Sequence, residues 1–131
     1  MKINVSFIVI SKKQKSQPLL ACINDGDKKF IPHFEFTQSD YPNIFEFARS
    51  KFKEISGLNA IDISGKGWVY LHVCGTIVKD NELYIVYGAI IPETMNVKNT
   101  EWISIFDLMQ KDLIEHDLMS QLAYCFNSIS R

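Results

Sequence analysis

The sequence predicts a domain of the α/β (α+β) class, in which segments with the character of strands occur together with amphipathic helices. Three observations support this prediction. Apolar segments with the character of strands lie on both sides of an amphipathic segment at residues 44–55. A glycine follows that segment directly, as it does at many helix ends. A second stretch with helical apolar spacing lies near the C-terminus, and its apolar stripe is sufficient for docking on a sheet.

The composition is that of an ordinary globular chain. Of the 131 residues 47% are hydrophobic and 22% charged, so residues 1–131 are expected to form one domain. The formal net charge of −1 provides no field to attract nucleic acid or an anionic membrane, and neither partner is expected. Cys22, Cys74 and Cys125 are scattered and odd in number, which favours unpaired core thiols and a cytoplasmic location. No apolar run approaches the ~20 residues that span a bilayer.

The first part of the sequence predicts three strands. Residues 3–10 form the first and residues 19–23 the second. Residues 24–27 (NDGD) predict a tight hairpin turn, because Asp-Gly supplies the positive φ angles that such a turn requires. Residues 28–34 then return as the third strand. Pro32 has no N–H to donate, so this strand is expected to lie at an edge, to bulge or to end there.

The central helix is predicted by one apolar stripe with clear ends. Asp40 is the expected N-cap, and Pro42 is expected in the first turn, where its missing N–H costs nothing. Ser56-Gly57 follows the last apolar turn and predicts the C-terminal end. The stripe consists of residues spaced three and four apart, namely Ile44, Phe47, Ala48, Phe52 and Ile55.

The segment after this helix predicts strands and turns. Ile61 and Ile63 mark a short strand candidate, and residues 64–67 (SGKG) are predicted to be a flexible turn without the spacing of a phosphate-binding loop. Residues 68–78 predict a long strand. The side chains expected on one of its faces are Trp68, Tyr70, His72 and Cys74.

A second hairpin and two helices are expected to complete the chain. Residues 80 and 81 (Asp-Asn) predict the hairpin turn, and the nearly apolar residues 83–91 predict a central strand buried on both faces. Ser104 with Asp107 and Asp112 with Glu115 have the spacing of helix capping boxes. The stripe of the last helix is expected to consist of Ile114, Leu118, Leu122, Cys125 and Ile129.

Residues 36–58 resemble the Nudix box, G-x5-E-x7-R-E-U-x-E-E-x-G-U, in which U is an aliphatic residue. The segment has the length of the box without a gap. Gly57-Leu58 falls at the closing G-U, Glu54 at the first of the paired glutamates and Phe52 at the first aliphatic position. Residues 101–108 (EWISIFDL) are also similar to the family's W-V-x-L-x-E-L segment. The order of predicted elements agrees with that of a Nudix domain.

The resemblance implies a Nudix-like α/β/α sandwich, with a mixed β-sheet packed between the box helix and the C-terminal helix. In that family the box glutamates hold the divalent cations that bridge a diphosphate. This sequence departs from the pattern at most of the chemically active positions. Phe36, Pro42, Ser50-Lys51 and Ile55 replace the opening Gly, the first Glu, the Arg-Glu pair and the second paired Glu. The box is therefore expected to keep its scaffold and to lack most of its metal ligands.

Glu54 is the candidate catalytic residue. If the domain is active, Glu54, Glu35 and Glu93 are the candidate ligands for magnesium or manganese. A divalent cation needs clustered carboxylates, and positions i, i+3 and i+4 of a helix share one face. In this chain those positions hold Lys51, Glu54 and Ile55. The competing interpretation of Glu54 is a solvated pair with Lys51.

Four residues are candidates for ligand contacts. The Lys51 ammonium is expected to take the electrostatic place of the cation and to attract a phosphate. Trp68 and Tyr87 are candidates for stacking a nucleobase, although aromatic residues at strand spacing are more commonly part of the core. His33, at the junction of a strand and a loop, is a candidate base or ligand contact, although such a histidine is more often only hydrogen-bonded.

Three functional interpretations follow. The leading one is a Nudix-like domain that binds a nucleotide-like small molecule or a protein partner, hydrolyses diphosphates poorly or not at all, and needs no cofactor. The alternative is an active hydrolase of a nucleoside diphosphate derivative, with magnesium or manganese in a rebuilt metal site. The second alternative is an interaction module of another α+β fold. In that case an apolar strand face forms an oligomer interface, for example in a homodimer, through Ile85, Tyr87, Ala89 and Ile91.

Overall fold

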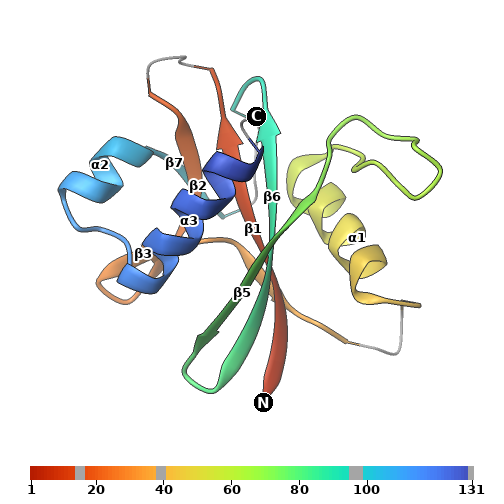
Figure 1. Cartoon of the computed structure of the whole chain (residues 1–131), viewed down its shortest axis with the longest axis horizontal. Coiled ribbons are helices and arrows are strands. Elements are labelled where there is room, and N and C mark those ends of the chain that lie inside the picture. Colours follow the sequence, from red (N-terminus) through yellow and green to blue (C-terminus); the bar gives the residue numbers. More distant parts are fainter. Residues whose placement is uncertain (14–16, 38–40, 95–98, 130–131) are drawn as a thin grey trace.

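The computed structural model describes residues 1–13, 17–37, 41–94 and 99–129, without the side chains of residues 126, 128 and 129. Within these ranges, strands of one mixed sheet are covered by helices on both faces (Figure 1). The strands are β1 (Lys2–Ser11), β2 (Leu19–Asp25), β3 (Lys28–Phe30), β4 (His33–Glu35), β5 (His72–Lys79), β6 (Glu82–Ile91) and β7 (Glu101–Ser104). The helices are α1 (Ile44–Ser56), α2 (Ile105–Gln110) and α3 (His116–Ile129). None of these described helices is long and apolar enough to cross a membrane.

Strand β1 is the axis of the sheet. It pairs in parallel with β6 along its whole length, from Lys2 opposite Glu82 to Ser11 opposite Ile91. On its other side it pairs antiparallel with β4 near its start and with β2 at its end. The sheet order is β3-β2-β1-β6-β5, with β4 beside β1 and β7 beside β2. Strand β5 therefore lies at an edge of the sheet, and β6 is the buried central strand that the sequence predicted.

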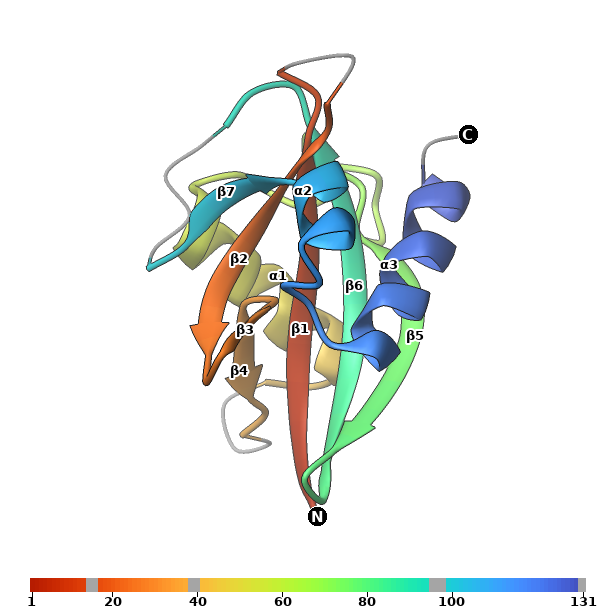
Figure 2. The same ribbon diagram turned by 90° about the vertical axis from the view of Figure 1, so that its left-hand side faces the viewer.

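Alternate residues of β1 feed two separate cores, as the pleat of a strand requires. Phe7 and its neighbours on one face pack against Phe47 and Phe52 of α1. Ile8 on the other face belongs to the cluster that holds Leu118 of α3. Figure 1 and the rotated view in Figure 2 show α1 on one side of the sheet, with α2 and α3 on the other. The predicted α/β/α sandwich is confirmed.

The two ends of α1 differ in how well the sequence predicted them. The C-terminal end is confirmed, because Gly57 has a left-handed φ of 76° and its N–H donates to the Lys53 carbonyl at 2.8 Å. The expected cap at the other end is wrong. Asp40 lies outside the described residues, and the N-cap is Asn43, whose side-chain oxygen accepts from the Glu46 N–H at 2.8 Å. Pro42 therefore precedes the cap instead of lying in the first turn.

The segment between α1 and β5 is less regular than predicted. Strand β5 begins at His72, not at residue 68, and Ile63 is fully exposed in a turn and belongs to no strand. A single isolated bridge joins Ala60 and Val69. The reason lies at Gly67, whose φ of 140° bends the chain close to the Ala60 backbone, leaving no room for a side chain.

Ser104 holds the N-cap position of α2 as expected, but neither predicted C-terminal capping box forms. The Ser104 hydroxyl precedes α2 but makes no capping hydrogen bond and is buried without a partner. Asp112 has a positive φ of 49°, and its carboxylate pairs with the Lys28 ammonium at 3.4 Å. It lies before α3, which begins at His116. Ile114 is buried as expected, but it precedes the helix and bridges to β3 at Lys29. Packing of the connection onto β3 has overridden the local helix signal.

The cysteines correct another expectation. Cys74 of β5 and Cys125 of α3 are both buried and joined as a disulfide, with 5.3 Å between their Cα atoms. Their positions, 51 residues apart in sequence, gave no sign of this pairing. Cys22 remains a free thiol, and burial, with a smaller contribution from the negative charge of Glu101, raises its pKa to about 12. It is therefore an inert core residue.

Candidate functional site

The face of α1 that corresponds to the Nudix-box glutamates carries an ion pair. The Lys51 Nζ lies 3.2 Å from the Glu54 Oε2, one helical turn away. The same ammonium group lies 5.6 Å from the ring centroids of Phe34 and Phe47. The Lys51 side chain is 25% exposed and that of Glu54 is 53% exposed. An aromatic cradle and a carboxylate thus hold one positive charge at this position, and that charge is still open to solvent.

The neighbouring box positions are occupied by structural contacts. Ile55 is 3% exposed and packs in the core cluster beneath α1, together with Phe52. Ser50, in place of the box arginine, lies 3.1 Å from the Tyr41 hydroxyl, with which it shares a hydrogen bond. Tyr41 in turn packs edge-on against Phe47. These side chains fix the helix on the sheet and on the preceding loop.

This donor set does not fit a divalent cation. Magnesium prefers several carboxylate or carbonyl oxygens in near-octahedral geometry. At the three clustered box positions there is one carboxylate, already paired with an ammonium group, and one isoleucine that faces the core. The described residues contain no group of three or more His, Cys, Asp or Glu side chains placed to hold a metal. Glu35 of β4 and Glu93 after β6 are both exposed and do not join Glu54 in such a group.

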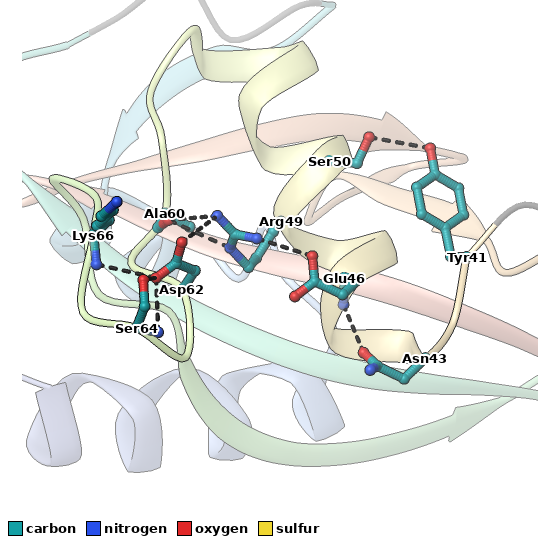
Figure 3. Close-up of polar contacts among 9 residues, drawn as sticks. All are labelled: Tyr41, Asn43, Glu46, Arg49, Ser50, Ala60, Asp62, Ser64 and Lys66. Carbon is teal, nitrogen blue, oxygen red and sulfur yellow. Dashed lines mark hydrogen bonds and ion pairs between the residues drawn. The ribbon is translucent and has the colours of Figure 1, made fainter.

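Arg49, on the neighbouring face of α1, is the centre of a second polar network (Figure 3). Its guanidinium lies 2.9 Å from the Glu46 carboxylate and donates twice to the Ala60 carbonyl, at 3.2 and 3.4 Å. The Asp62 carboxylate is 4.0 Å away. No local sequence signal indicates that this arginine ties the following loop to the helix.

Asp62 organises that loop. Its carboxylate accepts from the Ser64 N–H at 2.9 Å and from the Lys66 N–H at 3.0 Å (Figure 3). The hydrogen bond from the Ser64 hydroxyl, followed by that from the Lys66 N–H, lowers the pKa of Asp62 below its usual value. The SGKG segment is thus a turn held by a carboxylate, and its Lys66 N–H is used within the loop.

Two clefts adjoin these networks. One, of about 310 Å³, lies along the outer face of α1 and is lined by Tyr41, Pro42, Glu46, Arg49, Ser50, Lys53, Asn59 and Ala60. The other, of about 450 Å³, lies between the start of α1 and the start of β5 and is lined by Phe45, Ile61, Asp62, Ile63, Tyr70, Leu71, His72 and Val73. In the second cleft the Tyr70 and His72 rings pack against each other, with their centroids 4.4 Å apart and their planes tilted by 51°.

The remaining candidate ligand contacts differ in accessibility. Tyr87 is 4% exposed, packs against Phe7 and Phe45, and has its pKa raised by burial, so it is a core residue. His33 is half-buried, lies edge-on to Tyr84 and has its Nδ1 3.2 Å from the Ile31 carbonyl. Trp68 is 84% exposed and lies outside any strand. Of these three side chains, only that of Trp68 is open to a ligand.

The expected oligomer interface on β6 is wrong. Tyr87, Ala89 and Ile91 belong to the core cluster that α1 covers, and their exposed fractions are 4%, 1% and 0%. Ile85 is partly buried against the same cluster. This face of the sheet is filled by the chain's own helix and is not available to a second chain.

Comparison with known proteins supports the fold. No family model matches the sequence, and no curated protein sequence matches it. Solved structures do match. The C-terminal domain of mouse MUTYH, in complex with human PCNA, matches with a TM-score of 0.67 and 12% identity, over 98% of this chain and 88% of that one. The NUDIX domain of Shewanella oneidensis NrtR, complexed with ADP ribose, matches with a TM-score of 0.64 and 12% identity, over 92% of this chain and 85% of that one.

A hydrolase of the NUDIX family from Clostridium perfringens also matches, with a TM-score of 0.64 and 17% identity, over 98% of this chain and 97% of that one. These likenesses define the class of protein as an α/β/α sandwich with helices on both faces of a mixed sheet. More particularly, the chain has the Nudix fold. The alternative of an unrelated α+β fold is thereby set aside.

Proposed function

We propose that this Nudix-fold domain binds a phosphate-bearing, nucleotide-like ligand beside α1 and hydrolyses diphosphates poorly or not at all. The observation that carries the proposal is the ion pair between the Lys51 Nζ and the Glu54 Oε2, 3.2 Å apart. It places a fixed positive charge on the helix face where the Nudix box has carboxylates to hold a cation. An ammonium group can still attract a phosphate, but it cannot gather and activate water as a metal ion does.

The surroundings of Lys51 support a binding role. Its aromatic neighbours, Phe34 and Phe47, hold the ammonium group in place, and Glu54 satisfies it on one side only. A group that is 25% exposed keeps donor capacity for a ligand oxygen. The NrtR domain complexed with ADP ribose supports the choice of ligand class. The exposed Trp68 is the candidate for stacking the base.

Isothermal titration calorimetry with ADP-ribose in the presence of EDTA tests the binding. We expect binding without metal, and at least about tenfold weaker binding for Lys51→Ala, because a hydrogen bond to a charged group contributes about 1.5–3 kcal/mol. Lys53→Ala is the matched control. It removes the same charge from an exposed side chain that lies two residues from Lys51. Equal losses in the two variants, or no binding of ADP-ribose by the wild type, would contradict the proposal.

The competing function is an active hydrolase built around Glu54, whose side chain is 53% exposed. Measuring the release of AMP from ADP-ribose in the presence of manganese distinguishes the binding domain from the active hydrolase. We expect no release above that of the Glu54→Gln variant. Turnover that Glu54→Gln abolishes would establish the hydrolase instead.

A protein partner is the second candidate ligand, favoured by the likeness to the MUTYH domain in complex with PCNA. In that case ADP-ribose fails to bind, while the domain keeps its fold and its melting temperature. If the folded protein does not bind ADP-ribose, the result favours a protein partner over a nucleotide-like ligand.

A further inference from the structure

The outer side of strand β5 has no strand partner among the described residues. This strand is the last in the sheet order and pairs only with β6 among the described strands. The Thr76 carbonyl accepts from the Gln121 side chain of α3 at 3.1 Å, so it points away from β6. In an antiparallel strand the N–H and C=O of one residue point to the same side, so the Thr76 N–H also faces outward. In Figure 1 this edge lies toward the viewer.

The side chains along this edge form an exposed stripe. Val73 is 69% exposed and Val78 is 60% exposed, with the exposed Thr76 between them, whereas Cys74 and Ile77 are buried in the core on the other face. Val73 and Thr76 would lie on opposite faces in a regular strand. The pairing with β6 shows a register shift between Val73 and Gly75, and this bulge puts Val73 on the face of Thr76 and Val78.

The stripe is self-complementary about Thr76. A two-fold axis through an antiparallel pair at this residue places Thr76 opposite Thr76 of the partner subunit. Because the bulge absorbs one residue, the same axis places Val78 opposite Val73 of the partner subunit, and the reverse. Val–Val and Thr–Thr pairs opposite each other are favourable cross-strand contacts. The exposed backbone groups and the exposed side chains therefore share one symmetry.

We propose that a second copy of this chain pairs antiparallel with β5, giving a homodimer with a sheet continuous across the two-fold axis. A long edge strand with exposed valines is a template for pairing with another strand. A second copy fits because the stripe reads the same in both directions about Thr76, which a strand of another protein has no need to match. In the dimer the Thr76 N–H of each subunit donates to the Thr76 carbonyl of the other.

The Gln121 side chain is the device that this pairing displaces. Its amide nitrogen bonds the Thr76 carbonyl, while its oxygen is buried without a hydrogen-bond partner. This glutamine therefore covers the edge with only one of its two polar atoms hydrogen-bonded. A pairing strand offers the edge both a donor and an acceptor, so it displaces the glutamine side chain. Beside it, an open groove of about 620 Å³ between β5 and α3 is lined by Cys74, Gly75, Thr76, Ile77, Val78, Asp117, Ser120, Gln121 and Tyr124.

Sedimentation equilibrium tests the dimer and Thr76→Pro tests the interface. The wild type is expected to approach twice the 15.1 kDa chain mass as concentration rises. Proline at residue 76 removes an N–H that β6 does not use, so the fold survives and the dimer is lost. Thr76→Ala keeps the backbone donor and is expected to retain dimerisation. A monomer at every concentration, or a dimer that Thr76→Pro leaves intact, overturns the proposal.

Cross-linking tests the register. Residues in a hydrogen-bonded antiparallel pair have Cα atoms about 5.5 Å apart, which is within the range of a disulfide. Thr76→Cys alone is therefore expected to oxidise to a covalent dimer. Val73→Cys alone is not expected to do so, whereas Val73→Cys combined with Val78→Cys is. Efficient cross-linking of Val73→Cys alone, or none with Thr76→Cys, excludes this two-fold axis.

Discussion

The Ile55→Glu substitution restores the second of the paired Nudix-box glutamates, and the structure predicts that it destabilises the fold without creating a metal ligand. Ile55 is 3% exposed and lies in the core cluster with Phe7 and Phe52. Removing a buried isoleucine forfeits about 1.5–3 kcal/mol of apolar burial. The new carboxyl group takes its place in surroundings without a partner for its charge.

Ionisation adds a second penalty that depends on pH. A glutamate has a pKa of about 4.3 in water, and burial in an apolar core raises it by several units. If the folded state keeps the group neutral at about pH 7, the cost is about 1.4 kcal/mol for each of about 2.7 units, or roughly 4 kcal/mol. Together with the lost burial this makes roughly 5–7 kcal/mol, comparable to the whole stability of many domains. Because the folded pKa is the raised one, this second penalty is absent below about pH 4 and grows as pH rises towards the folded pKa.

Urea unfolding followed by tryptophan fluorescence, at about pH 4 and about pH 7, measures both penalties. The Ile55→Gln variant is the control, since it loses the same burial but has no group to titrate at this position. The extra loss at about pH 7 should appear only for Ile55→Glu. Manganese should not raise the melting temperature of either variant, because a ligand stabilises only a native state that it binds.

One result would refute this reasoning. Suppose Ile55→Glu, alone or with Lys51→Glu, lies within about 1 kcal/mol of the wild type and manganese raises its melting temperature. The helix face would then open on a cleft able to hold a cation. In that case this chain would lack the box carboxylates but would keep a backbone geometry that can hold a metal ion.

Three other predictions follow from single contacts. Asn43→Ala should lower the free energy of unfolding by about 1 kcal/mol in urea titrations, because it removes the N-cap of α1. Ser64→Ala should raise the pKa of Asp62 towards its usual value in a carboxyl NMR titration, since the Ser64 hydroxyl is the largest cause of the lowered pKa; the stabilisation that this pKa reflects is present above the unfolded value and is lost as pH falls. Cys125→Ser should cost about 4 kcal/mol more stability under non-reducing conditions than in excess reductant, by the chain-entropy relation for a 51-residue separation, because only the oxidised wild type has the cross-link.

Local signals in the sequence predicted much of the fold. Gly57 ends α1 and Asp80-Asn81 turns the second hairpin, each with the positive φ angles that its residue type favours. Pro32 divides the expected third strand into β3 and β4, and its carbonyl accepts from the Phe7 N–H at 3.0 Å. In these cases the constraint belongs to one or two neighbouring residues, so the sequence carries it openly.

Features that depend on distant partners were not predicted. Helix α3 begins later than the sequence predicted, because the preceding connection packs on β3. There the Lys29 N–H donates to the Leu113 carbonyl at 2.7 Å. The pairing of Cys74 with Cys125 follows from α3 crossing β5, which no spacing reveals. Within the site, the contact between Lys51 and Glu54 followed from helical spacing. The attachment of Arg49 to the Ala60 carbonyl needs the path of a loop that only the folded chain defines.

The parallel pairing of β1 with β6 also sets the order in which the chain can fold. During synthesis β1 emerges long before its partner β6, which begins only at Glu82, so the central ladder is a non-local contact of the kind that slows folding. Until Ile91 has left the ribosome, the surface on which α1 packs is incomplete, because β6 contributes part of it, and α3 has not yet been made. We expect the nascent chain to depend on chaperones over this interval and both layers of the sandwich to form together in one late step.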